Sequence, residues 1–134
     1  MSASVELQTL IYQTLVADPV VGALVDDRIY DGRPDTGGFP CVTFGASDYV
    51  EEDSQCITAR VETINLDVWA RSQGKLRPCK EICDAVKDAL HEADLSMALN
   101  ALVRIEVTGV RVFVDEDGLT AHGVVTVEAD IEEA

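Results

Sequence analysis

The stretch that decides the fold is ITARVETINLDVWAR, residues 57–71. In its second half every other residue is apolar: Ile64, Leu66, Val68 and Ala70. A period of two is typical of a β-strand that packs one face against a core. The first half alternates in the opposite phase: Ile57, Ala59 and Val61. We therefore predict one long strand over 57–71, with a β-bulge or strong bend near Glu62-Thr63 where the phase changes.

The segments on either side continue this pattern. Residues 75–93 place apolar side chains at helical spacing, and Asp115–Gly118 is typical of a hairpin turn. A second change of phase, across Thr108-Gly109, predicts a bulge. Ser4 is expected to cap the first helix. The expected elements are helices over 4–16, 18–25 and 75–93, and strands over 28–30, 41–50, 57–71, 101–114 and 119–131, the last with Leu119 on its apolar face.

This order of elements predicts an α+β fold. We expect a single domain over residues 1–134, with a largely antiparallel twisted sheet of about four to five strands. Two main helices should pack on one face of that sheet. The length of 134 residues and the 47% hydrophobic content are sufficient for a buried core. The sequence has no apolar run of the ~20 residues that cross a membrane, and no secretory signal is expected.

The charge of the chain restricts its partners. Twenty-five acidic residues against 10 basic ones give a formal net charge of −15. Because DNA-binding proteins neutralise phosphates with Lys and Arg, we do not expect the general surface of this acidic chain to bind nucleic acid. The alternative interpretation is that the charge only keeps the protein soluble. The four cysteines are expected to be reduced, with Cys79 and Cys83 in the apolar stripe of a helix rather than on a metal.

No motif indicates catalysis. The chain lacks a Gly-x-Ser-x-Gly elbow, and its Gly37-Gly38 pair is not followed by the Lys-Ser or Lys-Thr of a phosphate loop. The acids at 115–117 end within four residues, too short a run for a calcium loop. We therefore expect no catalytic residue, cofactor or metal.

Two charged segments and one tryptophan are candidates for contacts with other proteins. Four acids lie within six residues: Asp48, Glu51, Glu52 and Asp53. Half of the bases lie within 17 residues: Arg71, Lys75, Arg77, Lys80 and Lys87. Copies of such a chain could stack head to tail, although a solvated helix face is the alternative. Trp69 points away from the apolar face of its strand and is either an interface anchor or covered by the chain's own loops.

Several segments together resemble a known family. They are the opening helix, IYDGRP at 29–34, FPCVTFG at 39–45, NLDVWAR at 65–71 and TGVRV at 108–112. With the closing hairpin they cover nearly the whole chain, and they resemble the phage tail-completion family. Within it the resemblance is to tail terminators of bacterial gene transfer agents, which are phage-like particles.

The resemblance implies a structural role without catalysis. Tail terminators form a hexameric ring at the head-proximal end of the tail tube, stop its polymerisation and join it to the head connector. The implied partners are copies of the chain itself, the tube protein and the connector, with DNA passing through the ring without specific binding and no membrane. Assembly in the bacterial cytoplasm is implied. The alternatives are another neck or head-completion protein, a small acidic cytosolic binding domain, or an enzyme.

If this role holds, candidate interface or channel-lining residues can be named. The turn-rich segment 30–40 and the polar link 47–57 are long for simple connections, so they are possible docking segments. The candidates are Arg33, Phe39, Asp48, Glu51, Glu52, Asp53, Trp69 and Arg71.

Overall fold

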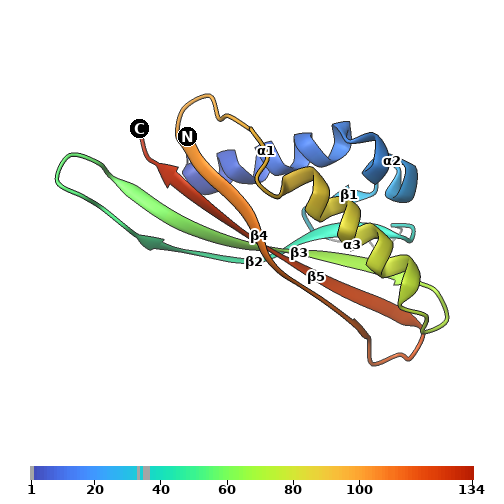
Figure 1. The fold of residues 1–134 in the computed structure, drawn as a ribbon. Helices are drawn as coiled ribbons and strands as arrows, with labels where there is room; N and C mark the ends of the chain where they lie inside the picture. The colour runs from blue at the N-terminus through green and yellow to red at the C-terminus, as the bar shows by residue number, and fades with distance from the viewer. Residues whose placement is uncertain (1, 33, 35–36) are drawn as a thin grey trace.

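A computed structural model describes residues 2–32, 34 and 37–134. It has two layers: a twisted five-stranded sheet, with three helices on one of its faces (Figure 1). The strand order is β1-β2-β3-β5-β4, and only β1 and β2 run parallel. This confirms the predicted α+β class. The elements are α1 (Ala3–Ala17), α2 (Pro19–Val25), β1 (Ile29–Tyr30), β2 (Cys41–Glu51), β3 (Ala59–Arg71), α3 (Arg77–Leu90), β4 (Ala101–Val114) and β5 (Thr120–Glu132).

Strand β3 lies at the centre of the sheet and contains no bulge. It pairs with β5 without interruption, from Ala59 opposite Glu132 to Arg71 opposite Thr120. The bulge predicted near Glu62-Thr63 is therefore wrong. Inward and outward side chains alternate without a break along the whole of β3. The first two inward positions are occupied by the buried Arg60 and Glu62, whereas the apolar pattern had predicted that Ile57, Ala59 and Val61 face inward.

The irregularities lie in the neighbouring strands. The register between β2 and β3 shifts between Phe44 and Ser47, so the irregularity is in β2, the partner of β3, and not in β3 itself. β4 shifts between Val107 and Gly109, which confirms the bulge predicted there, and also near its start. Gly118 in the β4–β5 turn has φ +70°, as its place in a tight hairpin requires. Leu119 precedes β5 and is 56% exposed, contrary to its predicted place on the inner face.

The helices begin and end at recognisable signals. The side chain of Ser2, not Ser4, caps α1 by accepting a hydrogen bond from the Val5 N–H. Asp18 caps α2 as a side-chain acceptor, with Pro19 at the first helical position. α3 is shorter than predicted, because it starts at Arg77 and ends at Leu90.

The core lies between the helices and the sheet. From α1 it takes Leu7, Ile11 and Leu15, which are fully buried; burying such side chains stabilises the fold by roughly 1.5–3 kcal/mol each. α3 contributes Cys79 and Cys83, both buried, as predicted.

Candidate assembly surfaces

A hairpin projects beyond the body of the molecule. We call residues 46–58, the outer part of β2 with the turn before β3, the arm; it extends to the left in Figure 1, and every residue in it is exposed. Its turn is held by the Glu52 N–H, which donates to the Ala59 carbonyl at 2.8 Å, and by the Ala59 N–H, which donates to Asp53 Oδ1 at 3.0 Å. The arm is therefore an ordered hairpin rather than the polar link expected at 51–56.

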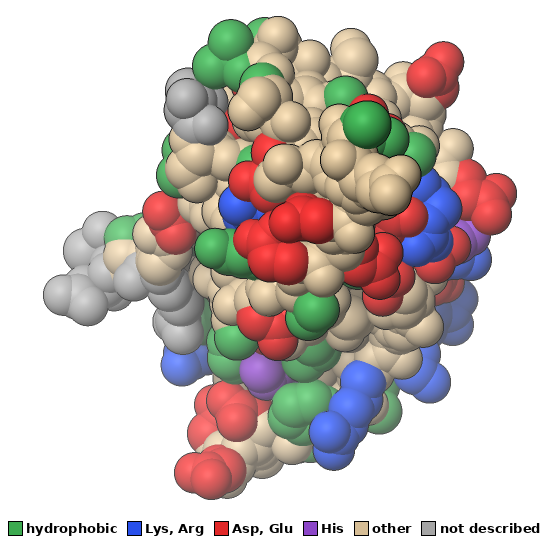
Figure 2. All heavy atoms as spheres, turned by 90° about the vertical axis from the view of Figure 1, so that its left-hand side faces the viewer, with side chains coloured by type: hydrophobic (Ala, Val, Ile, Leu, Met, Phe, Trp, Pro, Cys, Tyr) green, Lys and Arg blue, Asp and Glu red, His purple; other side chains and the backbone are tan. Residues whose placement is uncertain are grey.

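The surface of the arm is acidic with apolar side chains between the acids. It carries four carboxylates and no basic residue: Asp48, Glu51, Glu52 and Asp53. It also exposes Tyr49 by 48%, Val50 by 67% and Ile57 by 44%. Figure 2 views the molecule from the side of the arm, and acidic side chains gather there. Exposed apolar and charged groups on one projection are typical of a surface that binds another protein.

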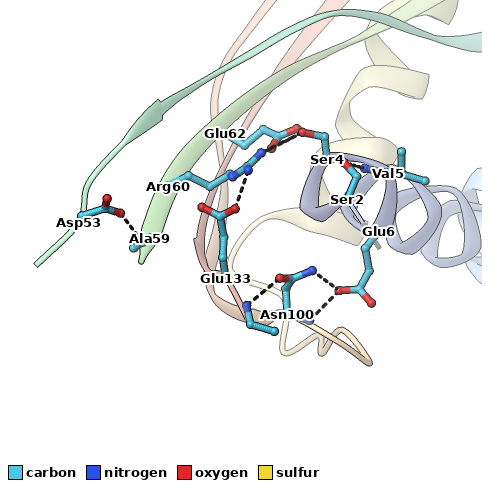
Figure 3. A network of polar contacts seen from close by, with 11 residues as sticks. Ser2, Ser4, Val5, Glu6, Asp53, Ala59, Arg60, Glu62, Asn100 and Glu133 are labelled. Carbon is cyan, nitrogen blue, oxygen red and sulfur yellow. Dashed lines mark hydrogen bonds and ion pairs between the residues drawn. The ribbon is translucent and has the colours of Figure 1, made fainter. Parts of the chain in front are cut away.

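Arg60 anchors the base of the arm (Figure 3). Its guanidinium lies 3.7 Å from the ring centroid of Tyr49. It donates to Glu133 at 2.6 Å and Ser4 Oγ at 3.2 Å, and it forms an ion pair of 3.4 Å with Glu62. The bond to Glu133 raises the pKa of Arg60 despite desolvation, so the side chain stays charged. One buried cation thus joins the arm, helix α1 and the C-terminal segment.

A second buried carboxylate holds the connection before β4 (Figure 3). Glu6 on α1 accepts hydrogen bonds from the N–H of Leu99 at 2.9 Å and of Asn100 at 2.8 Å. Asn100 in turn accepts one from the N–H of Ala134 through its Oδ1, at 3.0 Å. The backbone bond from Asn100 is the main cause that lowers the pKa of Glu6, against an opposing effect of burial.

Glu6→Gln is expected to destabilise the protein at neutral pH and to have little effect in acid. Because the pKa of Glu6 is lower in the folded state, its stabilising effect is complete above the unfolded pKa of about 4.3 and is lost as the pH falls through the folded value. The difference in Tm between wild type and variant should therefore shrink below about pH 4. Thermal melts across this range measure it, with the exposed Glu52→Gln as control; a difference that is constant with pH would contradict the prediction.

The sheet face opposite the helices carries a row of aromatic and polar side chains. Trp69 is half-buried there and stacks on His122 with ring centroids 3.8 Å apart. His122 Nε2 lies 2.8 Å from Asp67 Oδ1, and the Trp69 indole N–H donates to Thr43 Oγ1 at 3.0 Å. Contacts within the chain thus fix the ring of Trp69, while part of it stays accessible.

A basic patch lies where β3 leads into α3. It consists of four exposed side chains, with no acid among residues 71–80: Arg71, Lys75, Arg77 and Lys80. Glu81 pairs with Arg77 at 3.4 Å, and the charge of Arg71 helps to lower the pKa of Asp117 to about 2, after hydrogen bonds from Thr120 and Leu119. The guanidinium of Arg71 also lies 4.8 Å from the ring centroid of Phe39.

The structure divides the predicted candidates into two groups. Phe39, Trp69 and Arg71 lie toward one end of β3, whereas Asp48, Glu51, Glu52 and Asp53 lie on the arm at the other end. Arg33 lies outside the described residues.

Sequence reasoning missed the residues that hold the arm. Arg60 and Glu62 lie two residues apart and continue the alternation of Ile64, Leu66 and Val68 toward the start of β3. This continuous spacing is the signal that could have placed them on the inner face. The exposed apolar groups of the arm, Tyr49 and Val50, were missed because they occupy ordinary strand positions.

The described residues offer no obvious reactive centre. Among them, no group of three or more His, Cys, Asp or Glu side chains is placed to hold a metal ion. No disulfide links the four cysteines, and hydrogen bonding to Cys79 together with burial raises the pKa of the Cys83 thiol, which suppresses its reactivity. None of the helices within this part of the chain is long and apolar enough to cross a membrane.

The structure thus combines a small α+β fold with a projecting acidic hairpin and a basic patch at the other end of β3. The chain belongs to the tail completion protein gp17 family, whose model it matches over residues 9–132, and it is thus a structural protein of a phage-type tail. Among solved structures it is similar to a chain of one described as the virion of a native gene transfer agent particle, with 26% identity, a TM-score of 0.89 and 98% of each chain covered. Curated proteins gave no match.

Proposed function

We propose that the protein is a tail terminator of a phage-like particle. In this role it forms a ring, most simply a hexamer, on the head-proximal end of the tail tube, stops polymerisation of the tube and joins it to the head connector. The observation that carries the proposal is the similarity to a gene transfer agent virion chain over 98% of both chains. The family match over residues 9–132 supports the same role.

The mechanism is geometric and involves no turnover. A terminator needs two complementary surfaces for neighbouring copies in the ring, and further surfaces for the tube and for the connector. The arm, the basic patch and the uncovered sheet face are separate surfaces of the described part of the chain that can serve such contacts. A ring that binds the tube end and offers no further tube-like surface stops the addition of subunits.

The net charge supports passage of DNA through such a ring. At −15 per chain, six copies carry 6 × −15 = −90 formal charges. Acidic groups repel the phosphate backbone, so DNA would slide along the channel wall without sticking to it.

Deletion of the gene in the organism that produces the particle tests the proposal. Electron microscopy should then find filled heads without tails, beside free tails of uncontrolled length, and expression of the gene from a plasmid should restore normal particles. Unattached tails of normal length would instead assign the protein to completion of the head. Particles of normal appearance would exclude a role at the neck.

A further inference from the structure

The two ends of β3 carry complementary surfaces. We propose that, in the ring inferred above, the arm of each copy docks on the basic patch of the next copy. The proposal rests on the proposed function for the existence of a ring, and it adds the contact that closes it. It identifies the partner of the arm as a second copy of this chain.

Charge supports this pairing. The arm holds four negative charges and no positive one, whereas residues 71–80 hold four positive charges and no negative one. In a chain with only 10 bases, the patch therefore holds a large share of the positive charge. Other arginines are engaged within the fold: Arg28 with the Pro40 carbonyl, Arg60 with Glu133, and Arg104 with Glu128 and Asp130. Lys87 and Arg111 are also exposed, and within the patch Arg77 pairs with Glu81, but among the described residues the patch is where four exposed basic side chains lie within ten residues.

Apolar groups match at the same two places. Exposed ion pairs alone add little to an interface, so a stable contact also needs buried apolar surface. The arm offers Tyr49, Val50 and Ile57. Beside the patch lies Leu119, which is 56% exposed and whose carbonyl accepts a hydrogen bond from the Gly74 N–H at 3.0 Å. Covering Leu119 with the arm would remove apolar side chains from water on both partners.

The geometry requires two molecules. The 13 residues of β3 separate the arm from Arg71, a length of roughly 40 Å at about 3.3 Å per residue. The strand is paired along its whole length with β5 and cannot fold back on itself. The arm of one copy can therefore reach only the patch of another, in a head-to-tail contact. Head-to-tail contacts generate rings when the rotation between copies closes.

Cross-linking in assembled particles tests the contact directly. Cys56 is exposed near the tip of the arm, whereas Cys41, Cys79 and Cys83 are buried. In particles that contain Leu119→Cys, a short bismaleimide should link Cys56 to the new thiol and produce a ladder up to the size of the ring. Gln13→Cys on α1 and the double variant Leu119→Cys/Cys56→Ser should give no ladder. Tailed Leu119→Cys particles that yield only the single chain would overturn the docking, but not the terminator function.

Charge reversal provides a second test. An arm variant, Glu51→Lys/Glu52→Lys, and a patch variant, Lys75→Glu/Arg77→Glu, should each lower the yield of tailed particles at least ~10-fold in the deletion strain. Combining all four changes in one chain should restore the yield, because each arm then meets a patch of opposite charge. Circular dichroism and thermal melts confirm that each variant folds. Loss without restoration, in folded variants, would overturn the pairing of arm and patch.

Discussion

Gly123→Val is expected to lower the free energy of unfolding by about 3 kcal/mol or more. Gly123 lies on β5 opposite Val68, where α3 packs directly on the backbone of the sheet. A Cβ atom at this position would overlap Sγ of Cys83 and lie 3.0 Å from Sγ of Cys79. Because both sulfur atoms belong to a fully buried helix face, they cannot move aside without shifting the helix. Denaturant unfolding followed by circular dichroism measures the loss.

Two further variants separate this steric effect from a general effect of losing glycine. In Gly109→Ala the added Cβ meets no atom within 4 Å, so the stability should change by only ~0.5 kcal/mol. The smaller variant Gly123→Ala adds the Cβ atom alone and should also lower the stability. Cys83→Ala should partly restore the stability of Gly123→Ala, because it removes the overlapping sulfur atom. The coupling energy in this cycle should be at least ~1 kcal/mol, and additive effects would contradict a direct clash.

Arg60→Met is expected to destabilise the protein by about 3–5 kcal/mol. The variant removes the ion pairs to Glu62 and Glu133 and leaves Glu62, whose side chain is only 2% exposed, without a cation. It also removes the cation that stacks on Tyr49, so the base of the arm loses its attachment to the body. Denaturant unfolding measures the global effect, and amide hydrogen exchange should become faster in the arm.

A second change distinguishes the cost of an unpaired charge from the loss of packing. Arg60→Met/Glu62→Leu should recover a large part of the lost stability, since apolar residues often replace a buried ion pair without loss. Arg77→Met, which breaks the exposed pair with Glu81, should change stability by less than ~1 kcal/mol. A double variant less stable than Arg60→Met would contradict the interpretation.

The sequence was sufficient to predict the order of the elements and the class of the fold. Strand periodicity located β3, β4 and β5 to within two residues, because apolar side chains alternate along each of them, although β4 buries only Ile105. The same reasoning failed at Glu62-Thr63, because it treated Val61 as a core residue and overlooked a buried ion pair on the opposite phase. Ser4 and Glu133, which are distant in the sequence, stabilise that ion pair by accepting hydrogen bonds from Arg60. No local sequence pattern reveals these partners.

The candidate surfaces were predicted less completely. The acids at 48–53 and the bases from Arg71 were visible as runs of charge, but their positions at opposite ends of one strand depend on the three-dimensional fold. Trp69 was expected to be either an interface anchor or a covered residue. Its stacking on His122 could not be foreseen, because it requires the register between β3 and β5.

The last strand of the chain, β5, lies inside the sheet between β3 and β4. Because β5 follows β4 in the chain, β4 has no partner strand on the ribosome until β5 has been synthesised as well. Glu133, which holds Arg60 at the base of the arm, follows β5 directly in the chain. In a growing chain, therefore, the base of the arm gains its contact with Glu133 only after the last strand of the sheet has been made.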